Sequence, residues 1–167
     1  MAIKIGIDPS DTGTTAIVAL ENNKVIWKIK IIYASWLKHL EFIIDAFPEF
    51  VFRYENWYEM NYEFNIENCL PTNANASKDR DDLLRLLGAL ENKLNDLQIN
   101  FNWVSPRYTK SVVKNMENLS KYNDSCVWKY DKDTNLTYQY GKGWFYNNEK
   151  ISNHLRDAII IANYERI

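Results

Sequence analysis

Apolar residues dominate three successive segments at the start of the chain. In residues 3–8 every second position is isoleucine, which predicts a strand with one well-buried face. Residues 14–20 are β-branched or apolar and residues 25–32 are mostly apolar, so they predict a second and a third strand. The polar residues 21–24 between them are typical of a hairpin turn. The pattern therefore predicts an antiparallel meander of three strands.

Helical spacing follows the meander. Ser35 is a candidate N-cap, and apolar residues recur at three- and four-residue intervals over residues 36–47, which predicts a helix that ends at Pro48. Residues 49–55 (EFVFRYE) alternate again and predict a fourth strand. Because a helix connects the third strand to this one, we expect the fourth strand to lie parallel to an earlier strand.

The strongest helical pattern of the chain covers residues 79–97. Its leucines form a stripe that is wider than one buried helix face requires. Two interpretations are open. The helix is either well buried in its own domain, or it also contacts a partner subunit.

The remaining segments complete a mixed α/β pattern. Residues 99–104 predict a fifth strand, and Ser105, followed by proline, begins a short helix. Residues 127–145 are rich in Tyr, Trp and Thr and contain a candidate hairpin turn at residues 132–135. Residues 155–164 form the last predicted helix.

The composition limits the class of protein. The length predicts one domain over residues 1–167. No apolar run approaches the roughly 18 to 20 residues of a membrane span, and the first residues do not resemble a signal peptide, so we expect a cytoplasmic protein. The two cysteines are too few for a disulfide framework. Because the net charge is −2, any nucleic-acid site must be a local cluster of cations.

Ionisable residues stand at the ends of three predicted elements. Asp8 ends the first strand, Glu55 ends the fourth strand, and His154 and Asp157 are three residues apart on one face of the last helix. If the two strands are adjacent and parallel, both carboxylates emerge at the same sheet edge, where open α/β sheets place their ligands. A divalent cation would remove their mutual repulsion, and oxygen ligands suit Mg²⁺ or Mn²⁺.

Each of these residues also has a simpler explanation. Asp8, which precedes a proline, is a common way to begin a turn. Glu55 is equally consistent with an exposed strand end, and His154 and Asp157 with a solvated helix face. The metal-site interpretation depends on all four residues standing together at matching ends of their elements.

Three motifs carry a resemblance to a known family. "IGIDPS", "FRYEN" and "HLRDAIIIA" resemble the three motifs of RuvC-type Holliday-junction resolvases, within the RNase H-like superfamily of nucleases. The resemblance implies a mixed five-stranded sheet, with the first three strands antiparallel, flanked by helices. The small size and the loops are more similar to phage members, which implies the cytoplasm of a host cell. Ser10 departs from the family pattern, which usually has glycine there, so the path of this turn is open.

The resemblance implies a site and an activity. Asp8, Glu55, His154 and Asp157 would be the catalytic residues and would hold two Mg²⁺ ions, for which Mn²⁺ is expected to substitute. The implied reaction is hydrolysis of phosphodiester bonds in four-way junctions, and in related branched DNA such as forks. A homodimer would nick paired strands, and the helix over residues 79–97 is the expected interface.

The resemblance and the local charges also suggest residues that bind DNA. Tyr58 falls near an aromatic residue that resembles a junction wedge of the family, with Trp57 and Met60 as alternatives. "SPRYTKSVVK" (residues 105–114) is similar to a basic helix start of the family. The expected phosphate-binding cations are Lys78, Arg80, Arg107, Lys110 and Lys114.

Three alternatives compete with a junction resolvase. A branched-DNA-binding protein of the same fold would have weak or no nuclease activity. Another nuclease of the superfamily would act on RNA–DNA hybrids or flaps. "DTGTTAIVAL" is similar to a phosphate-binding hairpin of actin-like sugar kinases, but those enzymes need two lobes and a much longer chain.

Overall fold

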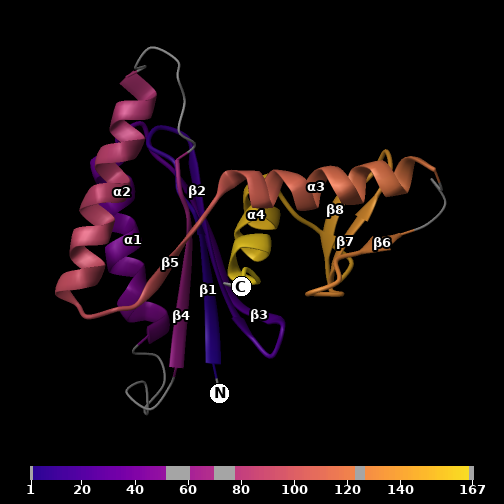
Figure 1. Cartoon of the computed structure of the whole chain (residues 1–167), viewed down its shortest axis with the longest axis horizontal. Helices are drawn as coiled ribbons and strands as arrows, with labels where there is room; N and C mark the ends of the chain where they lie inside the picture. The colour runs from indigo at the N-terminus through magenta and orange to yellow at the C-terminus, as the bar shows by residue number, and fades with distance from the viewer. Residues whose placement is uncertain (1, 52–60, 70–77, 123–126, 166–167) are drawn as a thin grey trace.

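A mixed five-stranded sheet forms the centre of the computed structural model, which describes residues 2–51, 61–69, 78–122 and 127–165 (Figure 1). Its strand order is β3-β2-β1-β4-β5. β1 and β2 are antiparallel, as are β2 and β3, whereas β4 and β5 continue parallel to β1. The strands are β1 (Ala2–Asp8), β2 (Thr14–Glu21), β3 (Lys24–Ile32), β4 (Asn61–Glu67) and β5 (Phe101–Val104). The predicted α/β class and antiparallel meander are confirmed.

The fourth strand lies later in the chain than its sequence pattern predicted. Helix α1 (Trp36–Val51) passes through Pro48 instead of ending there, so residues 49–51, which were predicted to begin a strand, are helical. The rest of that predicted strand lies outside the described residues. Proline removes one backbone donor from a helix, which weakens it without necessarily ending it. The true strand is β4, in which Tyr62, Phe64 and Ile66 alternate with polar residues.

Two helices cover one face of the sheet (Figure 1). Ile3, Ile5 and Ile7 of β1 are buried in one cluster with residues of α1 and α2 (Lys78–Asp96). Most leucines of α2 belong to this core, which accounts for much of the wide leucine stripe. Leu84 remains 41% exposed, and Leu97, just after the helix, remains 48% exposed.

Helix α4 (Asn153–Ala162) packs on the opposite face (Figure 1). A Cβ atom on Gly6 would lie only 2.0 Å from the carbonyl oxygen of Ala158, so only glycine permits this close approach of β1 and α4. The Asn65 side chain of β4 donates hydrogen bonds to the carbonyls of Ala162 and Tyr164 at 3.2 Å each. These contacts hold α4 in a fixed position over β1 and β4.

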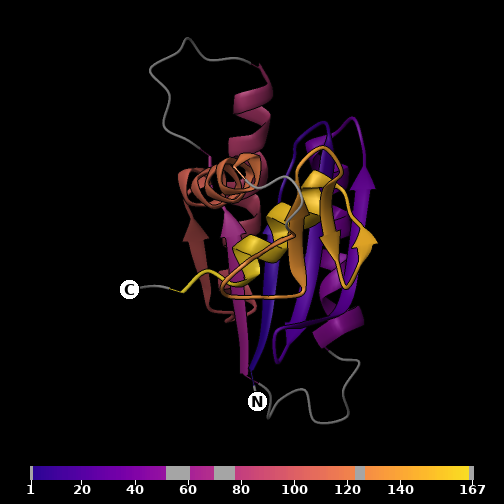
Figure 2. The ribbon, with the colours of Figure 1, turned by 90° about the vertical axis from the view of Figure 1, so that its right-hand side faces the viewer.

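Helix α3 (Pro106–Lys121) and a small antiparallel sheet lie beside α4 (Figure 2). The strands of the small sheet are β6 (Trp128–Lys129), β7 (Leu136–Gln139), β8 (Gly143–Tyr146) and β9 (Glu149–Lys150). The predicted hairpin turn joins β6 to β7, and in it the Asp133 carboxylate accepts a hydrogen bond from the backbone N–H of Asn135 at 3.0 Å. The hairpin prediction is confirmed, but the sheet contains two further hairpins.

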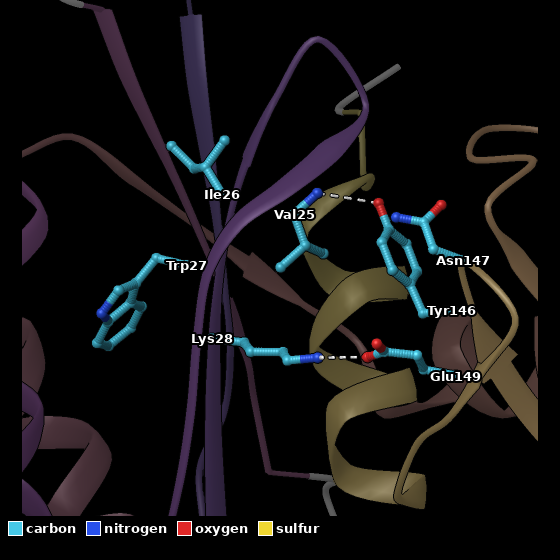
Figure 3. A pocket seen from close by; sticks show the side chains of 7 residues that line it. All are labelled: Val25, Ile26, Trp27, Lys28, Tyr146, Asn147 and Glu149. Atoms are coloured by element: carbon cyan, nitrogen blue, oxygen red, sulfur yellow. Dashed lines mark hydrogen bonds and ion pairs between the residues drawn. The ribbon is translucent and has the colours of Figure 1, made fainter.

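The small sheet contacts β3, which is an edge strand of the main sheet. The Tyr146 hydroxyl accepts a hydrogen bond from the backbone N–H of Val25 at 2.9 Å, and Lys28 lies 4.0 Å from a carboxylate oxygen of Glu149 (Figure 3). A groove of about 280 Å³, the β3 groove, lies between these strands. In the described parts of the chain, no helix has the length and apolar composition needed to span a membrane.

Candidate functional site

Asp8 ends β1 on the face that α4 covers, two residues after Gly6. It is only 8% exposed, and Oδ2 lies 3.1 Å from Nδ1 of His154 in the first turn of α4. Burial raises the pKa of Asp8, whereas the hydrogen bond to Asp8 raises the pKa of His154. Asp8 and His154 are therefore in contact, as the sequence predicted.

Glu67, which the sequence analysis missed, stands beside Asp8. The parallel register pairs Ile7 with Ile66, so Asp8 and Glu67 follow at the same edge of the sheet. Burial raises the pKa of Glu67 to about 7, and the charges of Asp8 and Asp157 act in the same direction. A sequence signal was available, because "NIEN" ends an alternating segment in the same way as "RYEN" does.

Glu55, the expected second carboxylate, lies outside the described residues. It comes before β4 in the chain, whereas the interpretation required it to end the strand next to β1. Glu67 has the position that was assigned to Glu55. Tyr58 and its alternatives also lie outside the described residues, so the wedge stays a prediction.

Asp157 lies one turn after His154 on α4 and is paired with its neighbour Arg156. Nε and Nη2 of Arg156 donate hydrogen bonds to the two carboxylate oxygens at 2.8 and 3.0 Å. Nη1 donates to the side-chain oxygen of Asn153 at 3.1 Å, and the guanidinium lies 5.0 Å from the ring centre of Trp144. The sequence analysis identified Asp157 but gave Arg156 no role.

The turn after β1 is fixed by buried hydrogen bonds. Nε2 of His39 lies 2.9 Å from the carbonyl oxygen of Tyr33, which can only accept, so Nδ1 of His39 accepts from the Thr15 hydroxyl, also at 2.9 Å. The Ser10 backbone N–H donates to the same hydroxyl at 2.9 Å. Ser10 is therefore accommodated where the family pattern has glycine, and the chain directly after Asp8 is held in place.

A groove of roughly 400 Å³ lies next to this cluster, between α3, α4 and the end of β4; we call it the acidic groove. Its lining residues are Glu67, Thr109, Lys110, Val113, Lys114, Glu117, Arg156 and Asp157. Two of the expected DNA-binding cations, Lys110 and Lys114, thus lie beside the carboxylates. Arg107 is exposed on the first turn of α3, and Arg80 lies on α2; neither lines the groove. Lys78 is the first residue of α2, and its side chain is not described.

The donor set has the chemistry of a divalent-metal site. Asp8, Glu67 and Asp157 supply carboxylate oxygens and His154 supplies a ring nitrogen. Burial is the main cause of the raised pKa of Glu67, and the charges of Asp8 and Asp157 raise it further. Within the described residues, no three His, Cys, Asp or Glu side chains are already arranged to hold a metal ion. Asp8 is paired with His154, and Asp157 is paired with Arg156.

Solved structures with the same architecture decide the fold. RuvC from T. thermophilus in complex with a Holliday junction substrate matches with a TM-score of 0.60 and 12% identity, over 98% of this chain and 91% of that chain. The structure of Thermus thermophilus RuvC matches with a TM-score of 0.53 and 13% identity, over 96% of this chain and 91% of that chain. The fold is that of RuvC. The expected RuvC-type fold, with a mixed five-stranded sheet flanked by helices, is thus confirmed for nearly the whole chain. The sequence itself matches no protein-family model and no curated protein.

Proposed function

We propose that this protein is a metal-dependent endonuclease that hydrolyses phosphodiester bonds in Holliday junctions and related branched DNA. The observation that carries the proposal is the convergence of Asp8, Glu67 and Asp157 with His154 at the edge of a RuvC-like sheet. The likeness to a RuvC structure that contains a Holliday junction supports the choice of substrate.

The proposed cofactor is Mg²⁺, with two ions per site and Mn²⁺ as a substitute. Asp8, Glu67, His154 and Asp157 would hold the ions. When bound, such ions activate the attacking water and stabilise the leaving oxygen of the phosphodiester. His154 must be neutral to act as a ligand, because a ring nitrogen that carries a proton has no lone pair for a metal.

The residues of the chain have separate tasks in this proposal. Asp8, which is buried against α4, would be held in a fixed position as a ligand. Lys110 and Lys114 lie on the α3 side of the acidic groove, opposite Asp157 on α4, and would hold the DNA backbone there. Contacts of this kind carry little sequence information and weaken steeply with salt.

A homodimer would place two such sites on the two strands of a junction, because a two-fold protein matches a two-fold substrate. The proposed interface is on α2, where Leu84 and the adjoining Leu97 keep exposed apolar surface. Sedimentation of the wild type beside Leu84→Lys tests this part separately from catalysis.

The test of the function uses a labelled synthetic four-way junction with Mg²⁺ and compares wild type, Asp8→Asn and Asp131→Asn. We expect paired symmetric nicks from the wild type and from Asp131→Asn, in which an exposed aspartate of the small sheet is changed. Asp8→Asn should cleave at least about 100-fold more slowly and still bind the junction. Equal cleavage by Asp8→Asn would contradict the proposed site.

A second candidate function is binding of branched DNA without cleavage. The observation that favours it is the pairing of Asp8 with His154 and of Asp157 with Arg156, which leaves no three ligands arranged for a metal among the described residues. Tight junction binding by wild type and Asp8→Asn, with no cleavage by either in Mg²⁺ or Mn²⁺, would support this candidate.

A further inference from the structure

Arg156 is a cation inside the cluster of acidic residues. Its side chain is 10% exposed, and it forms a two-point ion pair with Asp157, whose side chain is 22% exposed. A guanidinium fits a carboxylate in this way because its N–H groups are planar and match both oxygens. The positive charge of Arg156 therefore stands where Asp157 would contact a metal ion.

The pair with Arg156 and a metal ion at Asp157 oppose each other. A divalent ion bound to this carboxylate would lie within a few ångströms of the guanidinium, and the two positive charges would repel each other in a poorly solvated site. Binding of metal at Asp157 therefore requires Arg156 to move or to lose part of its ion pair.

The acidic groove offers Arg156 another anion. Arg156 lines the groove together with Lys110 and Lys114, which are the cations expected to contact the DNA backbone. A phosphate in the groove would present two oxygens to the guanidinium, in a geometry similar to that of the Asp157 carboxylate. The Trp144 ring and the Asn153 side chain hold the guanidinium from its other sides, so that an exchange of partner requires only a local movement.

We propose that Arg156 is an exchangeable cation that pairs with Asp157 in the free protein and with a backbone phosphate of the substrate in the complex. The exchange releases Asp157 for metal binding when DNA enters the groove. Arg156 is then a substrate-binding residue that also lowers the metal affinity of the DNA-free protein. This inference rests on the proposed function, because it takes Asp157 as a metal ligand.

The test measures two affinities of the full chain separately. Calorimetric titration with Mn²⁺ gives the metal affinity of the DNA-free protein, and a gel-shift titration in EDTA gives the affinity for a four-way junction. For Arg156→Gln we expect Mn²⁺ to bind roughly 10- to 100-fold more tightly, because charge-assisted hydrogen bonds no longer have to be broken, and the junction to bind at least about 5-fold more weakly.

Lys110→Gln is the matched control. It removes a positive charge from the same groove, but in the described part of the chain Lys110 makes no hydrogen bond with Asp157, so it should weaken junction binding while changing the Mn²⁺ affinity by less than about 3-fold. Arg156→Lys keeps the charge without the two-point geometry and should fall between wild type and Arg156→Gln in both measurements. Should Arg156→Gln not fold, as judged by thermal unfolding, Arg156→Lys carries the test.

The two measurements must change in opposite directions. A loss of both affinities in Arg156→Gln would mean that Arg156 only supports the structure, and an unchanged Mn²⁺ affinity would also overturn the inference. Addition of Asp8→Asn to Arg156→Gln should abolish the tight Mn²⁺ binding, since the metal would lie in this site. The proposed function fails on a different result, which is cleavage by Asp8→Asn equal to that of the wild type.

Discussion

The acidic groove and the β3 groove differ in how far their charged side chains are exposed to water. Beside the acidic groove, Asp8 and Glu67 are withdrawn from water, and both have raised pKa values. In the β3 groove (Figure 3), the charges of Lys28 and Glu149 are 4.0 Å apart and their side chains are 45% and 80% exposed. Water solvates this second pair, so its charges need no other partner.

This difference shows which feature of a groove indicates chemistry. Both are open grooves of comparable volume, about 400 and 280 Å³. A carboxylate that is kept out of water without a matching cation costs free energy, and such a cost is common at sites that bind a metal or a substrate. The polar residues of the β3 groove join the small sheet to the main sheet, so packing of the two sheets is enough to explain them.

The sharpest test of this comparison replaces one glutamate in each groove. Glu67→Gln removes a charge and a proposed ligand from the acidic groove, so junction cleavage should fall at least about 100-fold. Glu149→Gln, in the β3 groove, should cleave at the wild-type rate. Cleavage assays that also include Glu55→Gln decide whether Glu55 of "RYEN" or Glu67 of "NIEN" is needed for cleavage. A larger loss in Glu55→Gln than in Glu67→Gln would contradict the assignment of Glu67.

The acidic groove also depends on the close approach of β1 and α4. Gly6→Ala would place a Cβ atom 2.0 Å from the Ala158 carbonyl oxygen, so we expect the free energy of unfolding to fall by roughly 2–4 kcal/mol. Gly88→Ala is the matched control, because Gly88 is at an exposed position of α2 and a Cβ atom there meets nothing within 4 Å. Gly88→Ala should stabilise the protein by about 0.5–1 kcal/mol. Urea unfolding measures both effects, and equal stability of the two variants would argue against the tight β1–α4 contact.

The pH dependence of stability should come from the acidic groove and not from the β3 groove. The pKa of Glu67 is raised from 4.5 to about 7 in the folded protein, so between these pH values the folded state keeps a proton that the unfolded chain has released. Stability of the metal-free protein should therefore fall as pH rises from 5 to 7.5, by on the order of 1–2 kcal/mol after allowance for solvent screening.

Urea unfolding in EDTA at both pH values measures this slope. Glu67→Gln should flatten it, although Asp8 and His154 also have raised pKa values and contribute in the same direction. Glu149→Gln should leave it unchanged. Mg²⁺ should stabilise the protein more at pH 7.5 than at pH 5.5, because at the lower pH the metal must displace a proton. An identical slope in Glu67→Gln would contradict the raised pKa.

The smallest effects are expected in the β3 groove itself. Tyr146→Phe removes the acceptor of the Val25 backbone N–H and should lower the free energy of unfolding by about 1 kcal/mol. Lys28→Gln breaks only a long, exposed ion pair and should cost less than about 0.5 kcal/mol. Neither variant should change junction cleavage. A cleavage defect in either one would show that the β3 groove takes part in function after all.

Periodicity was enough to predict the elements that carry most of the site. The alternation that ends at Asp8 and the helical spacing around His154 and Asp157 place these residues correctly. The isoleucines of β1 are buried against α1 and α2, which leaves Asp8 on the opposite face, where α4 packs. The same rule failed at residues 49–51, where apolar residues fit either period and α1 continues to Val51. That error assigned to Glu55 the place beside Asp8 that Glu67 has in the structure.

Other parts of the site could not be predicted from spacing. Arg156 is adjacent to Asp157, and neighbouring residues on a helix normally point in different directions, so no helical pattern indicates that they pair. The hydrogen bonds of Thr15 with His39 and Ser10 join two separate elements and a turn. Such contacts depend on tertiary packing, which a single sequence does not display.

The contact between Asp8 and His154 joins residues 146 positions apart in the chain. During translation the strand with Asp8 emerges early, but its partners on α4 emerge only after the small sheet has been made. A ribosome-bound chain that stops before α4 therefore has the central strand without the α4 residues that contact it. Contacts between residues so far apart in the sequence also form slowly, because a long loop must close first. Under the proposed function, a growing chain should not cleave DNA until its last helix has folded back onto its first strand.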